Sequence, residues 1–400
     1  MKTAHIVGVG MNAPTIQAEK IIESCEILIG AKKQLNAFKA LGKPMFEGYG
    51  IEDVSRAFEE TGAGSAAVLV SGDAGFFSGA RELVSSLTGF EVRVTAGVPS
   101  VCDFFAKLQL PWQDAALISM HGAEGPLISA VRRNRLTFCL TGGNAPEIGA
   151  MLGFAGFGEL AVHVGENLGY PDERIYETKA FQLGELSAMT VLLIVNENFD
   201  ASVPAGIPDT SFIRAEGVPM TKSEIRAVVM SKLRIRPGDV CYDIGAGTGS
   251  VTVEMAMAAY SGRVYAIERE GGALALAGEN CRKFHIGNVS LISGDAPEAL
   301  CALPAPDAAF IGGSGGGFAA ILDAVLCKNP DARVAATAIS LETAHTALTE
   351  FEKKCLRDVE AVQIGVSRAV KRGGVHLLLA QNMVFIVCGG GKAACDDKKG

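Results

Sequence analysis

The stretch Asp243-Ile244-Gly245-Ala246-Gly247-Thr248-Gly249 decides the fold of the C-terminal half. It completes the strand-like run Val240–Ile244 and leads into a helix-like stretch, Ser250–Ala259, and a second strand-like run, Arg263–Glu268. A strand, a glycine-rich turn, a helix and a second strand form one right-handed βαβ unit. The sequence therefore predicts a Rossmann-like domain with a mostly parallel sheet and a nucleotide site at its carboxyl edge.

The glycine spacing of this loop favours a positively charged cofactor. The loop is Gly-x-Gly-x-Gly, and Ser250 stands where the dinucleotide pattern requires glycine. Asp243 would repel a diphosphate but attract the ammonium and sulfonium groups of S-adenosylmethionine. Glu268, at the end of the second strand, is placed to accept the ribose hydroxyls. The cofactor-binding residues predicted in this half are Thr221, Asp243, Gly245, Ala246, Gly247, Thr248, Gly249, Glu268, Asp295 and Ala296.

Two other classes of function stay open on the residues alone. One is a Rossmann-type nicotinamide-dependent oxidoreductase, and the other is a nucleotide-binding module without catalysis. Asp243 and Ser250 disfavour the first.

Length and composition limit the class of protein. The chain has 400 residues, a net charge of −8 and 48% hydrophobic residues, which fits a two-domain α/β enzyme. The negative charge argues against nucleic-acid binding. The apolar runs are too short to span a membrane. The ten cysteines include no C-x-x-C pair, so no metal is predicted and a cytoplasmic location is expected.

The linker between the predicted domains lies between Val195 and Val218, where a proline- and glycine-bearing stretch breaks the strand–helix rhythm. We expect domains over 1–205 and 206–400, with Thr221-Lys222-Ser223-Glu224 as a capping box at the start of the next helix. In the first half, the strand-like run Ala4–Val9 is followed by a helix-like stretch at residues 18–29. Residues 392–400 are small and polar and predict a frayed tail.

Further motifs in the C-terminal half resemble a known family. They are Gly217-Val218-Pro219-Met220-Thr221-Lys222, Ser293-Gly294-Asp295-Ala296-Pro297, Phe310-Ile311-Gly312-Gly313-Ser314-Gly315-Gly316 and Gln381-Asn382-Met383-Val384-Phe385-Ile386. Together with the glycine loop, they resemble the decarboxylating precorrin methyltransferases of cobalamin biosynthesis. The resemblance implies methylation at carbon 15 of the ring and loss of carbon dioxide from the acetate at carbon 12.

The N-terminal half has turns directly after strands but no second Rossmann pattern. These turns lie at residues 71–77, 96–101 and 140–144. Together with residues 164–175, they resemble the tetrapyrrole methylases of the carbon-5 precorrin branch, and the resemblance extends over residues 3–200. The resemblance implies a two-lobed α/β domain that binds S-adenosylmethionine and methylates carbon 5. The residues expected to bind the cofactor are Gly8, Gly10, Gly72, Asp73, Ala74, Phe76, Ser100, Val101 and Thr141.

The implied substrate is a precorrin or cobalt-precorrin, and the sequence leaves open whether cobalt is present. A corrinoid-binding module without catalysis also stays open. Methyl transfer to an electron-rich carbon needs alignment and exclusion of water rather than a protein nucleophile. Glu166, as a base, and Arg368 are the catalytic candidates. The substrate candidates are Lys222, Arg226, Gly313, Ser314, Lys371 and Arg372, with Arg132, Arg133 and Arg135 as further cations in the first half. We also expect a homo-oligomer and structural histidines.

Overall fold

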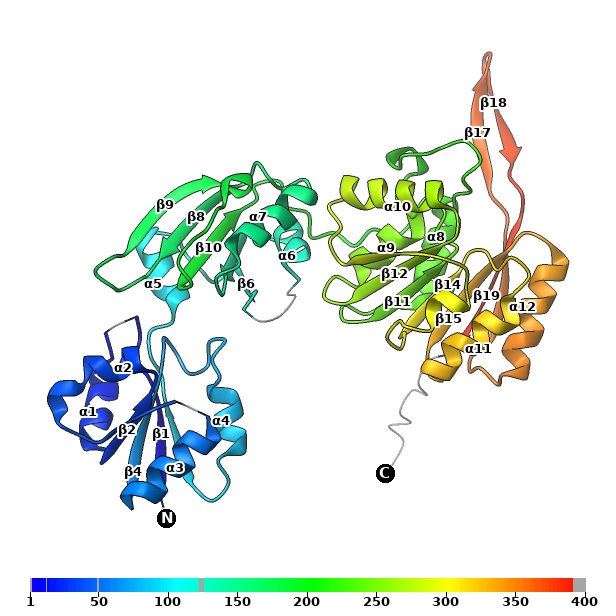
Figure 1. Cartoon of the computed structure of the whole chain (residues 1–400). Helices are drawn as coiled ribbons and strands as arrows, with labels where there is room; N and C mark the ends of the chain where they lie inside the picture. The colour runs from blue at the N-terminus through cyan, green and yellow to red at the C-terminus, as the bar shows by residue number, and fades with distance from the viewer. Residues whose placement is uncertain (1, 12, 49, 122–125, 391–400) are drawn as a thin grey trace, which may run out of the picture. The chain divides into compact units, whose positions relative to one another are not determined.

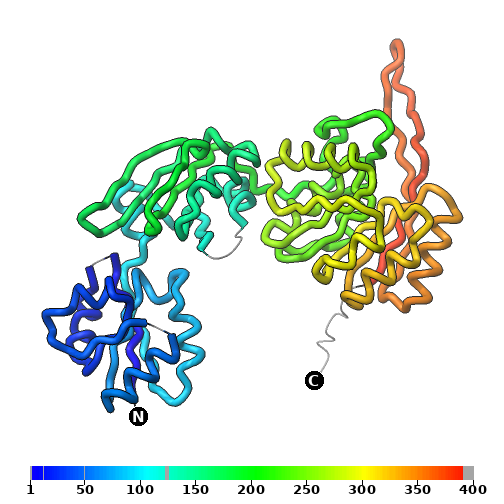
Figure 2. Tube along the Cα trace, in the orientation of Figure 1, coloured from blue at the N-terminus to red at the C-terminus, as the bar shows by residue number. Residues whose placement is uncertain are grey.

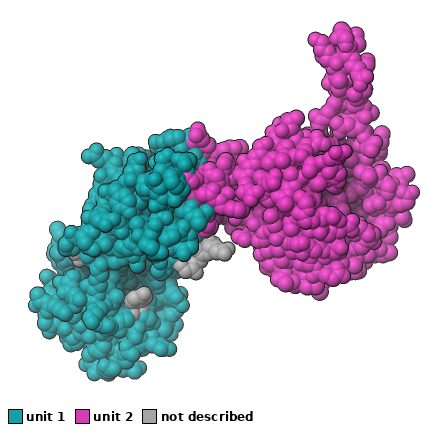
Figure 3. All heavy atoms as spheres, turned by 45° about the horizontal axis from the view of Figure 1, so that its top comes forward, with its two compact units in different colours: residues 1–125, 134–150, 159–197 teal, residues 126–133, 151–158, 198–400 magenta. Residues whose placement is uncertain are grey.

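The computed structural model describes residues 2–11, 13–48, 50–121 and 126–390. The chain divides into two compact units, which Figure 3 colours separately. Unit 1 comprises residues 1–125, 134–150 and 159–197, and unit 2 comprises residues 126–133, 151–158 and 198–400. The main division follows Glu197 and so precedes the boundary predicted near residue 205. The tail predicted over 392–400 lies outside the described residues.

Unit 1 contains two five-stranded sheets, whose strands can be followed in Figure 1. The first sheet is parallel, in the order β3-β2-β4-β1-β5. Its elements are β1 (Thr3–Gly8), α1 (Ile16–Ser24), β2 (Ile27–Gly30), α2 (Lys32–Ala37), β3 (Met45–Glu47), α3 (Ile51–Thr61), β4 (Ser65–Val70), α4 (Ala80–Ser86) and β5 (Glu91–Thr95). Helices α1 and α2 pack on one face and α3 and α4 on the other, so both faces are buried.

The helix-like stretch predicted at residues 18–29 is wrong in its second part. Helix α1 ends at Ser24, and β2 begins at Ile27. All four residues of β2 are buried because the strand lies inside the sheet between β3 and β4. A strand covered on both faces reads as a continuous apolar run, and periodicity alone does not separate it from a helix.

The second sheet of unit 1 is mixed, in the order β6-β7-β10-β8-β9. Its elements are α5 (Ser100–Lys107), β6 (Ala116–Ser119), β7 (Leu136–Leu140), α7 (Ala145–Phe154), β8 (Ala161–Glu166), β9 (Arg174–Lys179) and β10 (Thr190–Val195); α6 (Leu127–Arg133) and the end of α7 group with unit 2. Phe104 and Phe105 of α5 pack against Phe138 of β7 in its core. The two lobes expected for the N-terminal half are these two sheets.

Unit 2 is built on a seven-stranded sheet in the order β13-β12-β11-β14-β15-β19-β16. Its elements are α8 (Ser223–Leu233), β11 (Val240–Ile244), α9 (Ser250–Ala258), β12 (Arg263–Glu268), α10 (Gly271–Lys283), β13 (Val289–Ser293), β14 (Ala308–Ile311), α11 (Phe318–Lys328), β15 (Arg333–Ala338), α12 (Leu341–Lys353), β16 (Glu360–Ile364) and β19 (Val384–Gly390). The first five strands in that order are parallel, and β19 is antiparallel to both β15 and β16. The prediction of a mostly parallel, Rossmann-like sheet is confirmed.

Two apolar cores cover the two faces of this sheet. Side chains of α8 and α9 form one core, and side chains of α11 and α12 form the other. The predicted capping box before α8 is wrong, because the N-cap is Lys222 and its side chain makes no capping hydrogen bond. The Asp209 carboxylate instead accepts from Ser223 N at 3.0 Å.

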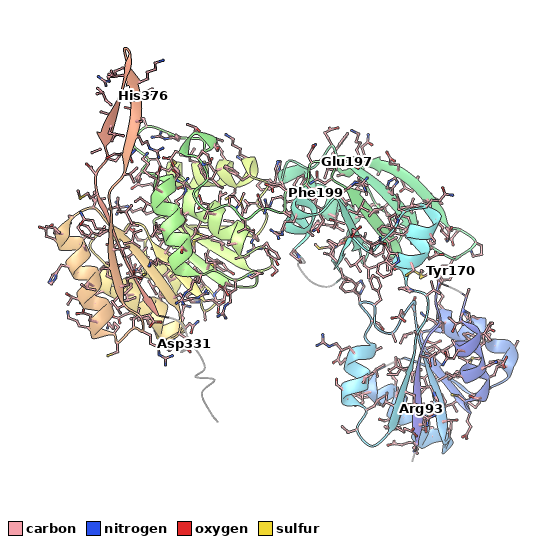
Figure 4. All side chains as sticks on the ribbon, turned by 180° about the vertical axis from the view of Figure 1, so that it is seen from behind. Arg93, Tyr170, Glu197, Phe199, Asp331 and His376 are labelled. Atoms are coloured by element: carbon pink, nitrogen blue, oxygen red, sulfur yellow. The ribbon has the colours of Figure 1, made fainter. Side chains whose placement is uncertain are left out.

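A two-stranded hairpin leaves the sheet between β16 and β19. Its strands are β17 (Ser367–Arg372) and β18 (Val375–Ala380), and every residue of both strands is exposed. The hairpin stands out from the body of unit 2 in the tube of Figure 2 and in the space-filling view of Figure 3. His376 on β18 lies at the opposite end of the unit from Asp331, which precedes β15 (Figure 4). The hairpin therefore projects from the carboxyl edge of the parallel strands.

Candidate active sites

The C-terminal cavity lies at the carboxyl edge of β11, β12 and β14 and has a volume of about 790 Å³. The loop after β11 is held by its neighbours, since Gly245 N and Ala246 N donate to the carbonyl of Ile267 at 2.9 and 3.1 Å. Gly312 N donates to Ile244 O at 2.9 Å and ties the loop after β14 to the same place. The parallel register of the three strands thus brings three glycine-bearing loops around one space.

Glycine is required in this loop because other backbones come within contact distance. A Cβ on Gly245 would lie 2.9 Å from Gly313 N, and one on Gly247 would lie 2.8 Å from Pro219 O. Both residues also have positive φ, at 78° and 55°. The loop leaves the cavity open to a ligand because no side chain can occupy these positions.

The lining of this cavity is acidic. Four carboxylates and one guanidinium are among its lining residues: Glu216, Glu268, Glu270, Asp295 and Arg269. Glu268 has the most defined geometry, since Oε2 accepts from Gly247 N at 2.9 Å and Oε1 from Glu270 N at 3.0 Å. A cationic ligand gains from such a surface and a diphosphate is repelled by it.

The prediction that Asp243 forms the pocket edge together with Glu268 is wrong. Asp243 is fully buried behind the loop and does not line the cavity, whereas Glu268 does. One carboxylate oxygen of Asp243 accepts a hydrogen bond from the Thr252 hydroxyl, and the other has no partner. Burial raises the pKa of Asp243 to about 6, an effect that the Thr252 hydrogen bond opposes.

The other residues predicted to bind the cofactor divide into two groups. Those that line the cavity are Gly245, Gly247, Asp295 and Ala296, and those that do not are Thr221, Ala246, Thr248 and Gly249. The substrate candidates Gly313 and Ser314 line the cavity as well. Gly249 instead allows close packing, because a Cβ there would lie 2.8 Å from the Cβ of Ala277 on α10. Arg269 and Glu270 also line the cavity and were missed, although they are the first two residues after the predicted strand Arg263–Glu268. Gly315, within the quoted motif after β14, lines the cavity too but was not among the predicted site residues.

Arg226 is not a substrate residue at the mouth of the cavity, which corrects that prediction. Its side chain is 0% exposed, with Nε 2.8 Å from Glu254 and Nη1 3.0 Å from Asp209. It also donates to the carbonyls of Thr221 and Ile207 and lies over the Phe212 ring at 4.8 Å. A buried guanidinium with this many partners fixes the linker against α8 and α9.

The remaining predicted cations of unit 2 lie outside the lining of the cavity. Arg368 is on β17, with Nη2 2.8 Å from Glu224 Oε2, and Lys222 Nζ is 3.9 Å from Asp209. Lys371 and Arg372 follow on β17 and are exposed. The hairpin thus carries three cations on one strand.

The N-terminal cavity lies within unit 1, between residues of its two sheets, and has a volume of about 560 Å³. From the first sheet it is lined by the loops after β2 and β4, and from the second by the loops after β6 and β7 and the start of β10. The predicted residues Gly72, Asp73, Phe76, Ser100 and Thr141 line it, and Gly8, Gly10, Ala74 and Val101 do not.

Three strand-end loops of the first sheet touch through their backbones. A Cβ on Gly97 would lie 2.1 Å from Gly72 O, and one on Gly8 would lie 2.6 Å from Gly97 N. Asp73 joins the loops, because Oδ2 accepts from Gly97 N at 2.9 Å and Oδ1 from Gly75 N at 2.8 Å. Gly8 and Gly97 do not line the cavity, but their close contacts hold the loop that carries the lining residues Gly72 and Asp73.

Glu166 does not line this cavity either. Its Oε1 lies 2.8 Å from Arg174 and its Oε2 accepts from Ser187 N at 3.1 Å, which fixes the chain just before the lining residues Ala188–Val191. His121, interpreted as structural, lines the cavity. Arg132, Arg133 and Arg135 do not line it, and Arg135 pairs with Glu197 at 2.8 Å.

Comparison with known proteins identifies relatives of both halves. The family described as "Precorrin methyltransferase domain" matches residues 212–388, and the family described as "Tetrapyrrole (Corrin/Porphyrin) Methylases" matches residues 3–184. The probable cobalt-precorrin-6B C(15)-methyltransferase (decarboxylating) of Pyrobaculum calidifontis is 42% identical over 46% of this chain and 94% of its own length. The chain belongs to the precorrin methyltransferase family.

Other relatives carry similar names. The cobalt-precorrin-6B C(15)-methyltransferase (decarboxylating) of Salmonella typhimurium is 38% identical over 45% of this chain and 93% of its own length. A solved structure described as precorrin-6y C5,15-methyltransferase from Geobacter metallireducens is 36% identical over 47% of this chain and 98% of its own, with a TM-score of 0.44.

This precorrin methyltransferase is thus an S-adenosylmethionine-dependent enzyme of cobalamin biosynthesis, with a tetrapyrrole methylase domain and a second methyltransferase domain. The acidic lining and the glycine cradle of the C-terminal cavity fit a ligand with ammonium and sulfonium charges. Among the described residues, no group of three or more His, Cys, Asp or Glu side chains could hold a metal ion. Over the same residues, no helix has the length and apolar character needed to cross a bilayer.

Proposed function

We propose that the chain methylates a precorrin or cobalt-precorrin at two ring carbons. The C-terminal domain transfers a methyl group to carbon 15, with loss of carbon dioxide from the acetate at carbon 12, and the N-terminal domain transfers one to carbon 5. The observation that carries this proposal is that each unit has its own cavity at the ends of strands. The relatives named as decarboxylating C(15)-methyltransferases support the carbon-15 part of the proposal.

The residues that line the C-terminal cavity would hold S-adenosylmethionine, which supplies a methyl group on a positively charged sulfur. Glu268 would accept the ribose hydroxyls, and the Asp295–Ala296 turn would contact the adenine. The acidic lining offsets the positive charge of the bound molecule. The Ser314 hydroxyl also lines the cavity and can donate a hydrogen bond to a substrate carboxylate.

The N-terminal cavity would hold a second molecule of the same cofactor. Its lining residue Asp73 is the carboxylate of the loop after β4, and the Thr141 hydroxyl donates to Thr190 O at 2.9 Å, which fixes the edge formed by β7 and β10. Enclosure between two sheets would exclude water from the transfer, which favours displacement at the methyl carbon.

Isotope counting tests the proposal on the full chain. The protein is incubated with a precorrin-6-type substrate and a labelled methyl donor, and methyl groups and carbon dioxide are counted per ring. We expect two methyl groups and one carbon dioxide. One methyl group with carbon dioxide would refute the carbon-5 activity, and none would leave a binding module. Tighter titration with a nicotinamide cofactor than with S-adenosylmethionine would indicate an oxidoreductase.

We also propose that the chain forms a homo-oligomer in the cytoplasm. Val375, Leu377 and Leu378 on β18 are exposed, and a two-stranded sheet leaves unpaired edges for another copy. The nine cysteines of the described residues are free, as expected in a reducing compartment. Sedimentation of the full chain and of a Leu377→Ser, Leu378→Ser variant tests the association, since a monomeric wild type would refute it.

A further inference from the structure

The carboxyl edge of unit 2 has an apolar surface beside the C-terminal cavity. Ile339 is 78% exposed, Leu341 is 70% exposed and Met383 is 56% exposed. We call these three residues the apolar patch. Large apolar side chains this open to water are unusual as a group, and such groups mark binding surfaces.

Strand register places the patch on the same edge as the cavity. Ile311 of β14 pairs with Ala336 of β15 in parallel, so the cavity residues Gly313 and Ser314 and the patch residue Ile339 leave the sheet at the same edge. Strand β19 runs antiparallel to β15, with Phe385 opposite Ala338. Met383, two residues before Phe385, therefore lies beyond that edge as well.

Local structure holds two patch residues in place. Ser340 is the N-cap of α12, and its hydroxyl accepts from Thr343 N at 3.2 Å. This capped turn fixes Ile339 and Leu341 on either side of Ser340. Their exposure is therefore a property of an ordered helix start.

The charges around the patch differ on its two sides. In the order of the sheet, β11, β12 and β14 carry the acidic cavity on one side of β15 and β19. On the other side, the connection between β16 and β19 is the hairpin with Arg368, Lys371 and Arg372. The patch thus lies between a surface suited to a cation and a strand suited to carboxylates.

We propose that Ile339, Leu341 and Met383 form the seat for one face of the ring macrocycle during methylation at the C-terminal cavity. The inference rests on the proposed function. A tetrapyrrole has a broad apolar ring with carboxylates at its rim, and this combination matches an apolar patch next to a basic strand. The acidic cavity repels the rim carboxylates and accepts the methyl donor, so the two ligands are sorted by charge.

Kinetics of patch variants of the full chain test the seat. In an Ile339→Ser, Leu341→Ser variant, we expect the KM for the precorrin-6-type substrate to rise on the order of tenfold. The KM for S-adenosylmethionine and the Tm should stay as in wild type. In a second variant, Ile339→Ser is combined with Leu341→Met, which keeps an apolar side chain at position 341. This variant should recover most of the affinity for the tetrapyrrole substrate. Ile16→Ser is the matched control, because Ile16 is 73% exposed at the start of α1 in unit 1.

Several outcomes would overturn the seat. An unchanged substrate KM in the double serine variant would do so, as would an equal rise in the KM for S-adenosylmethionine. If sedimentation velocity showed that the variant dissociates, the patch would be an interface between copies instead. Absorbance titration of the same tetrapyrrole separates the seat from the proposed function. If the wild type binds the tetrapyrrole without turnover and the variant does not bind it, the seat is supported and the proposed function is not. If the wild type does not bind the tetrapyrrole, both are refuted.

Discussion

The two cavities show two ways of building a site from the ends of strands. In unit 2, one parallel sheet provides three adjacent loops, and the cavity lies at a single edge. In unit 1, loops from a parallel sheet face loops from a mixed sheet. The aspartates differ accordingly, since Asp73 lines its cavity and Asp243 is buried behind its loop. An aspartate near the carboxyl end of a strand can therefore line a site, as Asp73 does after β4, or lie behind it, as Asp243 does within β11.

The largest expected effect comes from the backbone contacts in unit 1. Gly97→Ala would place a Cβ 2.1 Å from Gly72 O, which must push the loop of Gly97 away from the loop that carries the cavity residues Gly72 and Asp73. We expect carbon-5 transfer to fall about 100-fold or more and stability to fall by about 3 kcal/mol. Carbon-15 transfer should persist, because unit 2 has its own cavity. Product analysis by mass spectrometry measures both transfers.

The control for this substitution is Gly184→Ala in the same unit, where a Cβ would meet nothing within 4 Å. It should leave both transfers unchanged. Equal loss of both transfers in Gly97→Ala would contradict the separation of the two sites.

The buried aspartate of unit 2, Asp243, predicts that the stability of this unit depends on pH. Because burial raises the pKa of Asp243 to about 6, the folded state holds a proton that the unfolded state releases near pH 4. The contribution of Asp243 to the free energy of unfolding is therefore most favourable below about pH 4. It falls by about 3 kcal/mol in total as the pH rises to about 6. The asparagine of Asp243→Asn does not titrate. The unfolding free energy of wild type minus that of the variant should therefore fall by about 3 kcal/mol between pH 4 and pH 6.

Chemical denaturation between pH 4 and pH 7 measures that difference. A flat difference for Asp243→Asn would show that the carboxylate is not held in an apolar environment.

The cofactor contact proposed for Glu268 predicts an effect of intermediate size. Glu268→Gln removes the charge and weakens two hydrogen bonds to backbone amides, those of Gly247 and Glu270. Hydrogen bonds to charged groups contribute about 1.5–3 kcal/mol, so we expect roughly 10- to 100-fold weaker binding of S-adenosylmethionine at the C-terminal cavity. Calorimetry on the full chain should show one weakened site and one unchanged site. Glu279→Gln, on the exposed face of α10, should change neither.

The sequence predicted the C-terminal fold well because each signal there is local. The apolar run before Gly245, the glycine spacing and the acid at Glu268 lie within one βαβ unit, and the structure has all of them in the predicted order. The position of Asp243 could not be predicted. Whether a carboxylate at a strand end faces the ligand or the core depends on the packing of α9, from which Thr252 reaches it.

Other features depended on contacts between distant segments. Arg226 looked like a surface cation, but Asp209 and Glu254 reach it from the linker and from α9. His121 and Met189 line the N-terminal cavity because two sheets meet there, and no spacing in the sequence reports that meeting. Residues that line a site within one motif were therefore predictable, and residues contributed across sheets were not.

The smallest expected effect tests whether the hairpin binds the substrate while the C-terminal cavity binds the cofactor. Arg368 is half-exposed and pairs with Glu224, so its removal should cost less than about 1 kcal/mol of stability. If its guanidinium attracts rim carboxylates, Arg368→Ala should raise the substrate KM a few-fold and leave S-adenosylmethionine binding unchanged. Glu224→Gln breaks the same ion pair but keeps the cation. It should leave the substrate KM at or below the wild-type value, whereas a rise equal to that of Arg368→Ala would mean that the pair only positions the hairpin.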